Sequence, residues 1–160
     1  MKLSNVKEWG SKPRTMLRFI QCGDIFVFKL YEGNFGFGRV LAKVDLGHVV
    51  EVFDKVLKSP SVTTELIEQA KRLGSPIILD SYSLFDRRLE GDWQIIAHHD
   101  GFRMSDTDNV SFVYGHPNAW KKIDVLGNES AISDSEASLL PSYSPTRDAS
   151  VRSLFIPDHP

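Results

Sequence analysis

Apolar and β-branched residues gather into three consecutive runs near the start of the chain, and together they predict three antiparallel strands. The first run covers residues 24–31 and is followed by the turn Glu32-Gly33-Asn34, whose residues tolerate positive φ. The second run covers residues 35–44. The third covers residues 48–54, after a turn that contains Gly47.

The second run has two unlike faces, because side chains alternate along a strand. One face is bulky and the other is nearly bare near its start: the first carries Phe35, Phe37, Arg39 and Leu41, the second Gly36, Gly38 and Val40. The glycines are interpreted as turn and close-packing residues, since their spacing does not fit a dinucleotide-binding loop. Arg39 needs a partner on its face, and Asp24 or Glu51 is expected to supply it.

A helix is predicted over residues 63–73. Its apolar stripe consists of Leu66, Ile67, Ala70 and Leu73. Acidic residues lie early, basic residues lie late and Gly74 follows, which suits the helix dipole and a C-terminal cap. A short strand over residues 77–79 and a helical turn over 84–89 follow.

A second β-rich block starts at Asp92 and includes Trp93, which is expected in the core. Strands are predicted over residues 92–98, 110–114 and 119–126, with a polar loop over 104–109. The serine-rich composition of residues 127–150 predicts a mobile arm with a short helix from 134 to 140. An apolar island at residues 151–156 is expected to dock as a strand or clip.

These elements predict a mainly β (α+β) fold: a twisted antiparallel sheet with one packed helix at about 63–73 and a mobile C-terminal arm. Residues 1–126 are expected to form one globular domain, and residues 127–160 the arm. The chain has 160 residues, of which 41% are apolar, enough for a real core.

The charge and the cysteine content limit which kinds of partner the protein is expected to bind and in which cellular compartment it is expected. The net charge of −2, with both signs interspersed, argues against a nucleic-acid or anionic-membrane partner. Cys22 is the only cysteine, so no intramolecular disulfide can form. Without a signal peptide or a long apolar segment, the protein is expected in the cytoplasm.

No sequence motif indicates a cofactor or a nucleophile elbow. The strongest candidate for a metal-binding group consists of His98, His99 and Asp100. Neighbouring residues of a strand point to opposite faces, so separate structural roles for the two histidines are favoured over a shared metal. No metal and no organic cofactor are expected.

Arginine and tryptophan side chains are the candidates for contact with another protein, because both types are enriched where interfaces bind most strongly. Trp9 and Trp120 lie near the ends of predicted elements, and Arg39, Arg87 and Arg88 complete the set. Arg39 can instead be a structural ion pair.

Four segments resemble the immunity protein 26 family of bacterial polymorphic-toxin systems: residues 23–26 with Leu30, 36–40, 50–54 and 91–96. The residues that carry the pattern are Gly23, Asp24, Gly38, Arg39 and Trp93. The resemblance implies a mainly β cytoplasmic protein that binds a cognate toxin and neutralises it by stoichiometric occlusion. It supplies no catalytic residues.

The same family also carries a phosphotriesterase label, so a small organophosphate hydrolase is the alternative. Under that hypothesis His98, His99 and Asp100 would bind a metal, with Asp80 or Asp92 completing the set. An eight-unit barrel hydrolase is excluded by length, since it needs about 250 residues. A protein-binding module unrelated to toxins is a third possibility.

Overall fold

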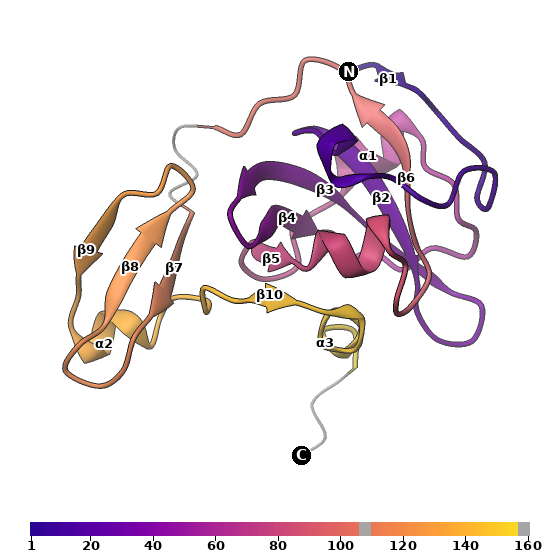
Figure 1. Ribbon diagram of the computed structural model, residues 1–160. Helices are drawn as coiled ribbons and strands as arrows, with labels where there is room; N and C mark the ends of the chain where they lie inside the picture. Colours follow the sequence, from indigo (N-terminus) through magenta and orange to yellow (C-terminus); the bar gives the residue numbers. More distant parts are fainter. Residues whose placement is uncertain (106–109, 157–160) are drawn as a thin grey trace.

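Two β-sheets dominate the computed structural model, which describes residues 1–105 and 110–156 (Figure 1). The larger sheet has the order β1-β6-β2-β3-β4-β5-β10, and its strands are β1 (Leu3–Ser4), β2 (Asp24–Lys29), β3 (Phe35–Val44), β4 (Gly47–Val52), β5 (Ile77–Leu79), β6 (Trp93–His99) and β10 (Pro145–Thr146). The smaller sheet consists of β7 (Ser111–Tyr114), β8 (Lys121–Asp124) and β9 (Glu129–Ala131). The predicted mainly β fold is therefore confirmed.

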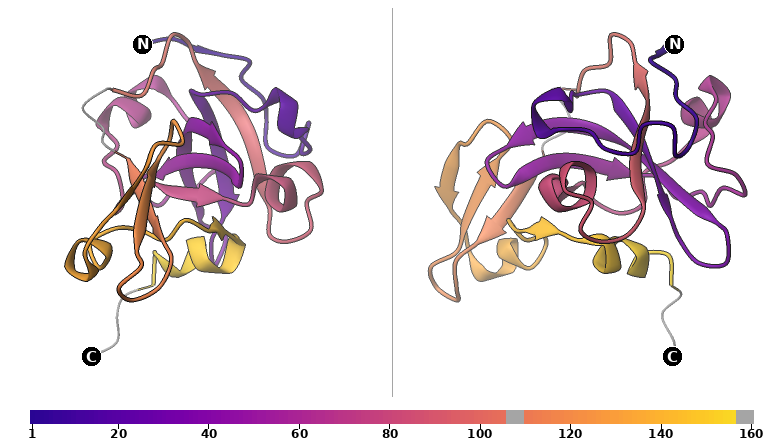
Figure 2. Two further views of the ribbon diagram at one scale, coloured as in Figure 1. Left: turned by 60° about the vertical axis from the view of Figure 1, so that its left-hand side comes forward. Right: turned by 45° about the vertical axis from the view of Figure 1, so that its right-hand side comes forward.

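All strand pairs are antiparallel except β10 with β5, which is parallel. The helical segments are short: η1 (Leu17–Phe19), α1 (Thr64–Gln69), η2 (Tyr82–Asp86), α2 (Asp134–Ala137) and α3 (Asp148–Ser153). The views in Figure 2 show the smaller sheet beside the larger one, with the C-terminal segment returning along the larger sheet to α3. No helix in residues 1–105 or 110–156 is long and apolar enough to span a membrane.

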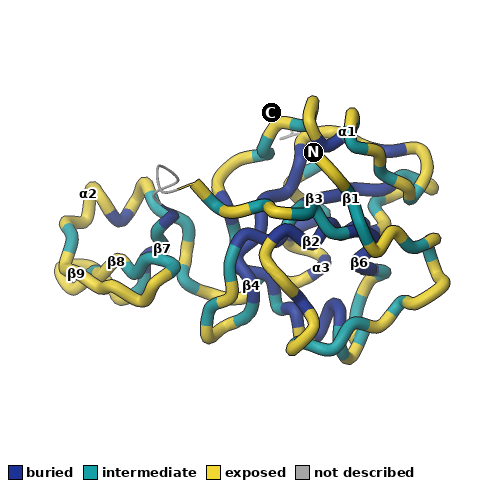
Figure 3. Tube along the Cα trace, turned by 90° about the horizontal axis from the view of Figure 1, so that it is seen from above, coloured by how far each residue is buried: buried dark blue, intermediate teal, exposed yellow. Residues whose placement is uncertain are grey.

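The larger sheet is covered on both faces, so its central strands are buried (Figure 3). On one face, Phe26, Phe28 and Trp93 pack with Phe85 of η2 and Val151 of α3. The opposite face holds the second cluster, which includes Val27, Phe35, Phe37, Phe53 and Ile67. A third cluster links the two sheets through Leu41, Val49, Ile78, Val110 and Phe112.

The bare face of β3 is filled by aromatic rings from β2. Gly36 pairs with Phe28 and Gly38 with Phe26 across the two strands. A Cβ atom on Gly36 would lie 2.4 Å from Cζ of Phe28, and one on Gly38 would lie 2.5 Å from Cζ of Phe26. Only glycine leaves room for these rings, which confirms the close-packing interpretation.

The predicted helix is present but shorter than expected. Thr63 caps α1 by accepting a hydrogen bond from the N–H of Leu66, and the chain becomes extended at Ala70. Leu73 lies off the helix and packs against the opposite face of the sheet. The reason is pairing with the end of β4, where the N–H of Leu73 donates to the carbonyl oxygen of Val52 at 2.7 Å.

The C-terminal segment has more regular structure than its composition predicts. It contains β9, α2, β10 and α3, and the apolar island docks as a helix rather than a strand, with Val151 fully buried. A buried hydrogen bond holds α3, since Nε1–H of Trp93 donates to Oδ1 of Asp148 at 2.9 Å. Whether the chain divides at residue 126 stays a prediction.

One local prediction needs adjustment, and another falls mostly outside the described residues. The helical turn expected over residues 84–89 is the π-helix η2, which begins two residues earlier and ends at Asp86. Of the loop expected over 104–109, residues 106–109 lie outside the described part of the chain.

Candidate partner-binding site

A cavity of about 450 Å³ lies between the N-terminal segment and the strands β2 and β6. Asp24 and His98 line it from the two strands, and the N-terminal segment contributes Lys7, Lys12 and Arg14. The segment runs along β6, where the N–H of Lys7 donates to the carbonyl oxygen of Ile96 at 2.8 Å, before the chain enters β2 at Asp24. Of this segment, sequence patterns singled out only Trp9.

The pair Asp24 and His98 forms the wall of this cavity. Asp24 is only 6% exposed, and its Oδ1 lies 2.8 Å from Nδ1 of His98. Its Oδ2 accepts the N–H of Gln21 at 2.8 Å. Burial raises the pKa of the Asp24 carboxyl, and the bonds from Gln21 and His98 oppose that rise. An ionised carboxylate only accepts, so Nδ1 of His98 carries the hydrogen in this pair.

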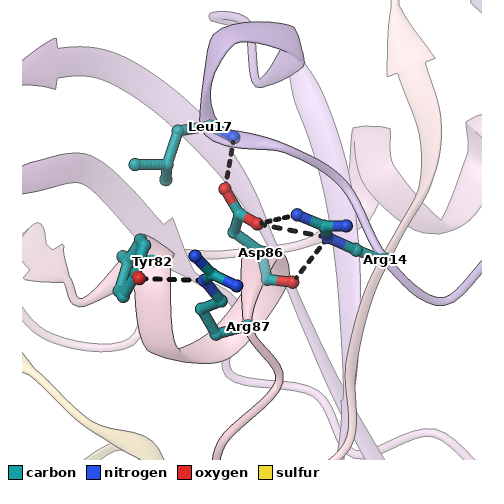
Figure 4. Close-up of polar contacts among 5 residues, drawn as sticks. All are labelled: Arg14, Leu17, Tyr82, Asp86 and Arg87. Carbon is teal, nitrogen blue, oxygen red and sulfur yellow. Dashed lines mark hydrogen bonds and ion pairs between the residues drawn. The ribbon is translucent and has the colours of Figure 1, made fainter.

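The basic side of the cavity continues over η1 and η2 (Figure 4). Asp86 accepts hydrogen bonds from Arg14 through Oδ1, at 2.8 Å from Nη2, and from the N–H of Leu17 through Oδ2 at 3.3 Å. Arg14 is the main cause of a lowered pKa for the Asp86 carboxyl. Beside it, Nε of Arg87 donates to the hydroxyl of Tyr82 at 2.8 Å. These bonds join η1 to η2 and fix two arginines at the surface.

A second polar network occupies the other face of the sheet. Arg39 pairs with Glu51 at 2.9 Å, and Arg72 contacts the same carboxylate at 3.3 Å. Of the two carboxylates expected to hold Arg39, the structure uses Glu51. The guanidinium also stacks over Phe102, with 4.0 Å between its Cζ and the ring centroid. Arg39 is therefore a structural ion pair with little free surface.

His99 belongs to this second network rather than to the cavity. Its Nδ1 lies 3.0 Å from Nη1 of Arg39. A guanidinium only donates, so Nδ1 accepts and the ring hydrogen is on Nε2. Burial, followed by the charge of Arg39, lowers the pKa of His99. The two adjacent histidines thus have different partners, as their alternation along the strand predicts.

The structure does not bring the five hydrolase candidates together. His98 bonds Asp24, His99 bonds Arg39, and Asp100 accepts from Ser4. Asp92 precedes β6 while the histidines end it, a separation of about 20 Å along the strand. Asp80 follows β5, four strands from β6, and pairs with Arg147. No three His, Cys, Asp or Glu side chains of the described residues form a group able to hold a metal.

The five partner-binding candidates differ in how much surface they offer. Arg87 is exposed, whereas Arg88 is half-buried and contacts Asp92 at 3.5 Å. Trp9 packs edge-on against Phe35, with ring centroids 5.4 Å apart. Trp120 is half-buried beside β8. With Arg39 held by Glu51, Arg87 is the candidate best placed to meet another protein.

The family-pattern residues have clear structural roles. Gly23 has φ of 95°, and a Cβ there would lie 2.9 Å from the carbonyl oxygen of His99. Gly38 makes room for Phe26, and Trp93 is fully buried. Asp24 and Arg39 anchor the two polar networks.

Sequence reasoning missed the basic residues that line the cavity, Lys7, Lys12 and Arg14, although a signal existed. Residues 1–21 contain five lysines and arginines but only one acidic residue, Glu8. The even mixture of charges over the whole chain obscures this local excess. Cys22, close by, has a pKa raised by burial, which does not favour a reactive thiolate.

The comparisons with known proteins identify one family. The sequence profile of immunity protein 26 matches residues 21–124, about two thirds of the chain, and includes Asp24, Arg39 and Trp93. No curated protein and no solved structure matches the chain significantly. Because the match covers well over half of the sequence, this protein belongs to the immunity protein 26 family.

Proposed function

We propose that this protein is a cytoplasmic immunity protein that binds a cognate bacterial polymorphic toxin and neutralises it by stoichiometric occlusion. Family membership is the observation that carries the proposal, since an immunity protein acts through a toxin partner. A complex of ordinary stability buries on the order of 1,200 to 2,000 Å² in total.

The surface chemistry supports binding of a protein. Exposed arginines stack on aromatic rings at two places: Arg18 over Phe19, at 4.8 Å, and Arg87 over Tyr82, at 5.4 Å. Arginine and aromatic side chains supply much of the binding energy in protein interfaces. Such pairs are ordered before the partner arrives, which lowers the entropy cost of association.

Co-expression tests this function in cells. A toxin whose gene adjoins the gene of this protein should stop bacterial growth when it is expressed by itself. Growth should recover when this protein is expressed together with the toxin. An unrelated immunity protein of equal expression serves as control. Growth arrest that persists beside soluble, folded protein would contradict the proposal.

An assay of the purified protein on a phosphotriester distinguishes the hydrolase alternative from the toxin-binding function. The binding function predicts no turnover above the level of a His98→Ala, His99→Ala double variant. Repeated turnover by the wild type, lost in that variant, together with no protection from the toxin, would assign the protein to the hydrolases.

A further inference from the structure

The first 21 residues carry a net positive charge, unlike the chain as a whole, and several of them line one side of the cavity. The whole chain has a net charge of −2, whereas this segment has five basic side chains and one acidic one. Lys7, Lys12 and Arg14 line the cavity. A concave, positively charged wall attracts carboxylates and increases their rate of encounter.

The two lysines differ in exposure: Lys12 is exposed, whereas Lys7 is half-buried and its Nζ donates to the carbonyl oxygen of Asn5 at 3.5 Å. Arg14 is held by Asp86, but neither Lys7 nor Lys12 forms an ion pair with any residue in the described ranges. Asp24 hydrogen-bonds Gln21 and His98 rather than a lysine, although burial raises the pKa of its carboxyl and the charge of Lys7 is among the smaller effects that oppose this rise. The lysines therefore retain their binding capacity at the mouth of the cavity.

Apolar anchors lie next to the free charges. Phe19 also lines the cavity and is 55% exposed, a high value for a phenylalanine. The guanidinium of Arg18 covers its ring, and Tyr82 with Arg87 continues the surface beyond Asp86 (Figure 4). We call this area the basic-aromatic surface and define it by Lys7, Lys12, Arg18, Phe19, Tyr82 and Arg87.

We infer that the basic-aromatic surface binds an acidic segment of the toxin and that the cavity receives one of its carboxylate side chains. The inference rests on the proposed function and specifies its interface. A protein partner fits better than RNA, since RNA binding relies on many phosphate contacts along an extended basic stripe, whereas the basic residues here gather at a single cavity of about 450 Å³.

Charge reversal tests this inference on the full-length protein. The double variant Lys7→Glu, Lys12→Glu should bind the toxin encoded next to this protein at least about 10-fold more weakly than the wild type, mainly through slower association. The matched control is Lys121→Glu, Lys122→Glu, which makes the same charge change at exposed positions of β8. It should bind within about twofold of the wild type. Thermal unfolding of both variants verifies that they are folded.

Reciprocal substitution in the toxin identifies the carboxylate. An Asp→Lys or Glu→Lys change at the contact should weaken binding to the wild type and restore binding to the Lys7→Glu, Lys12→Glu variant. If the Lys7→Glu, Lys12→Glu and Lys121→Glu, Lys122→Glu variants bound the toxin with equal affinity, the assignment of the surface would be overturned while the proposed function would stand. Failure of the wild type to bind would overturn both. If the Lys7→Glu, Lys12→Glu variant lost an RNA binding that the wild type shows, while its toxin binding stayed unchanged, the surface would be assigned to nucleic acid instead.

Discussion

At the scale of single residues, the rings of Phe28 and Phe26 explain why β3 carries glycine at positions 36 and 38. Gly36→Ala should lower the free energy of unfolding by about 1–3 kcal/mol, because the new Cβ would overlap the ring of Phe28. In a Phe28→Leu background the same change should cost less than half as much, as the ring is gone. Urea denaturation of the four proteins gives the comparison. An equal cost in both backgrounds would show that the ring is not the obstacle.

His48 gives the fold a pH dependence of known sign. The residue is 2% exposed, and its Nδ1 lies 2.7 Å from the hydroxyl oxygen of Ser81. Burial, with a smaller effect from Lys43, lowers its pKa from 6.5 to about 4. Between these values the unfolded chain binds more protons, so stability is full above pH 6.5 and falls as the pH drops toward 4.

The loss attributable to His48 should be at most about 3 kcal/mol. Denaturation at pH 7.5 and 4.5 measures it, with His48→Gln as the reference, since glutamine has a similar length and does not titrate. The wild type should lose more stability than the variant over this interval. Identical losses would place the responsible groups elsewhere.

The residue scale also shows what a sequence can reveal about a site. Either Asp24 or Glu51 was expected to pair with Arg39, and the structure uses Glu51, which lies opposite Arg39 on the neighbouring strand β4. The bond between Asp24 and His98 was missed, because it depends on the register of β2 against β6, and the two residues lie 74 positions apart in the chain. A local sequence pattern indicates on which face of a strand a side chain lies, but it does not identify which residue from a distant part of the sequence the side chain contacts.

At the scale of elements, strands β2 to β8 and the start of α1 were predictable, whereas β1, β9 and β10 were not, and the end of α1 is set by tertiary pairing. Helix α1 stops at Gln69 because the following residues pair with the end of β4. The return of the C-terminal segment to β5 was missed for a similar reason. Its serine-rich composition hides the few residues that dock it, such as Asp148 and Val151.

The docking of α3 depends on a buried hydrogen bond from Trp93 to Asp148. Asp148→Ala should destabilise the protein by about 1–3 kcal/mol, since the indole N–H would lose its acceptor. Asp148→Asn keeps a carbonyl oxygen and should cost less than half as much, although it weakens the pair with Arg152. Denaturation midpoints measure the two losses. The same midpoint for both variants would mean that the acceptor contributes little.

At the scale of the whole molecule, the larger sheet is covered on both faces, and the N-terminal segment of the chain carries an excess of positive charge beside a cavity. This combination suits recognition better than it suits the hydrolase alternative, whose candidate residues are dispersed over the sheet. Membership of the immunity protein 26 family points to a toxin as the partner.

The most direct measurement is a titration of toxin activity with this protein, at a toxin concentration well above the dissociation constant. Stoichiometric occlusion predicts a linear fall in activity that ends near one equivalent, with no recovery over time. Inhibition far below one equivalent would indicate catalytic inactivation of the toxin. Undiminished activity at a large excess of folded protein would contradict the account.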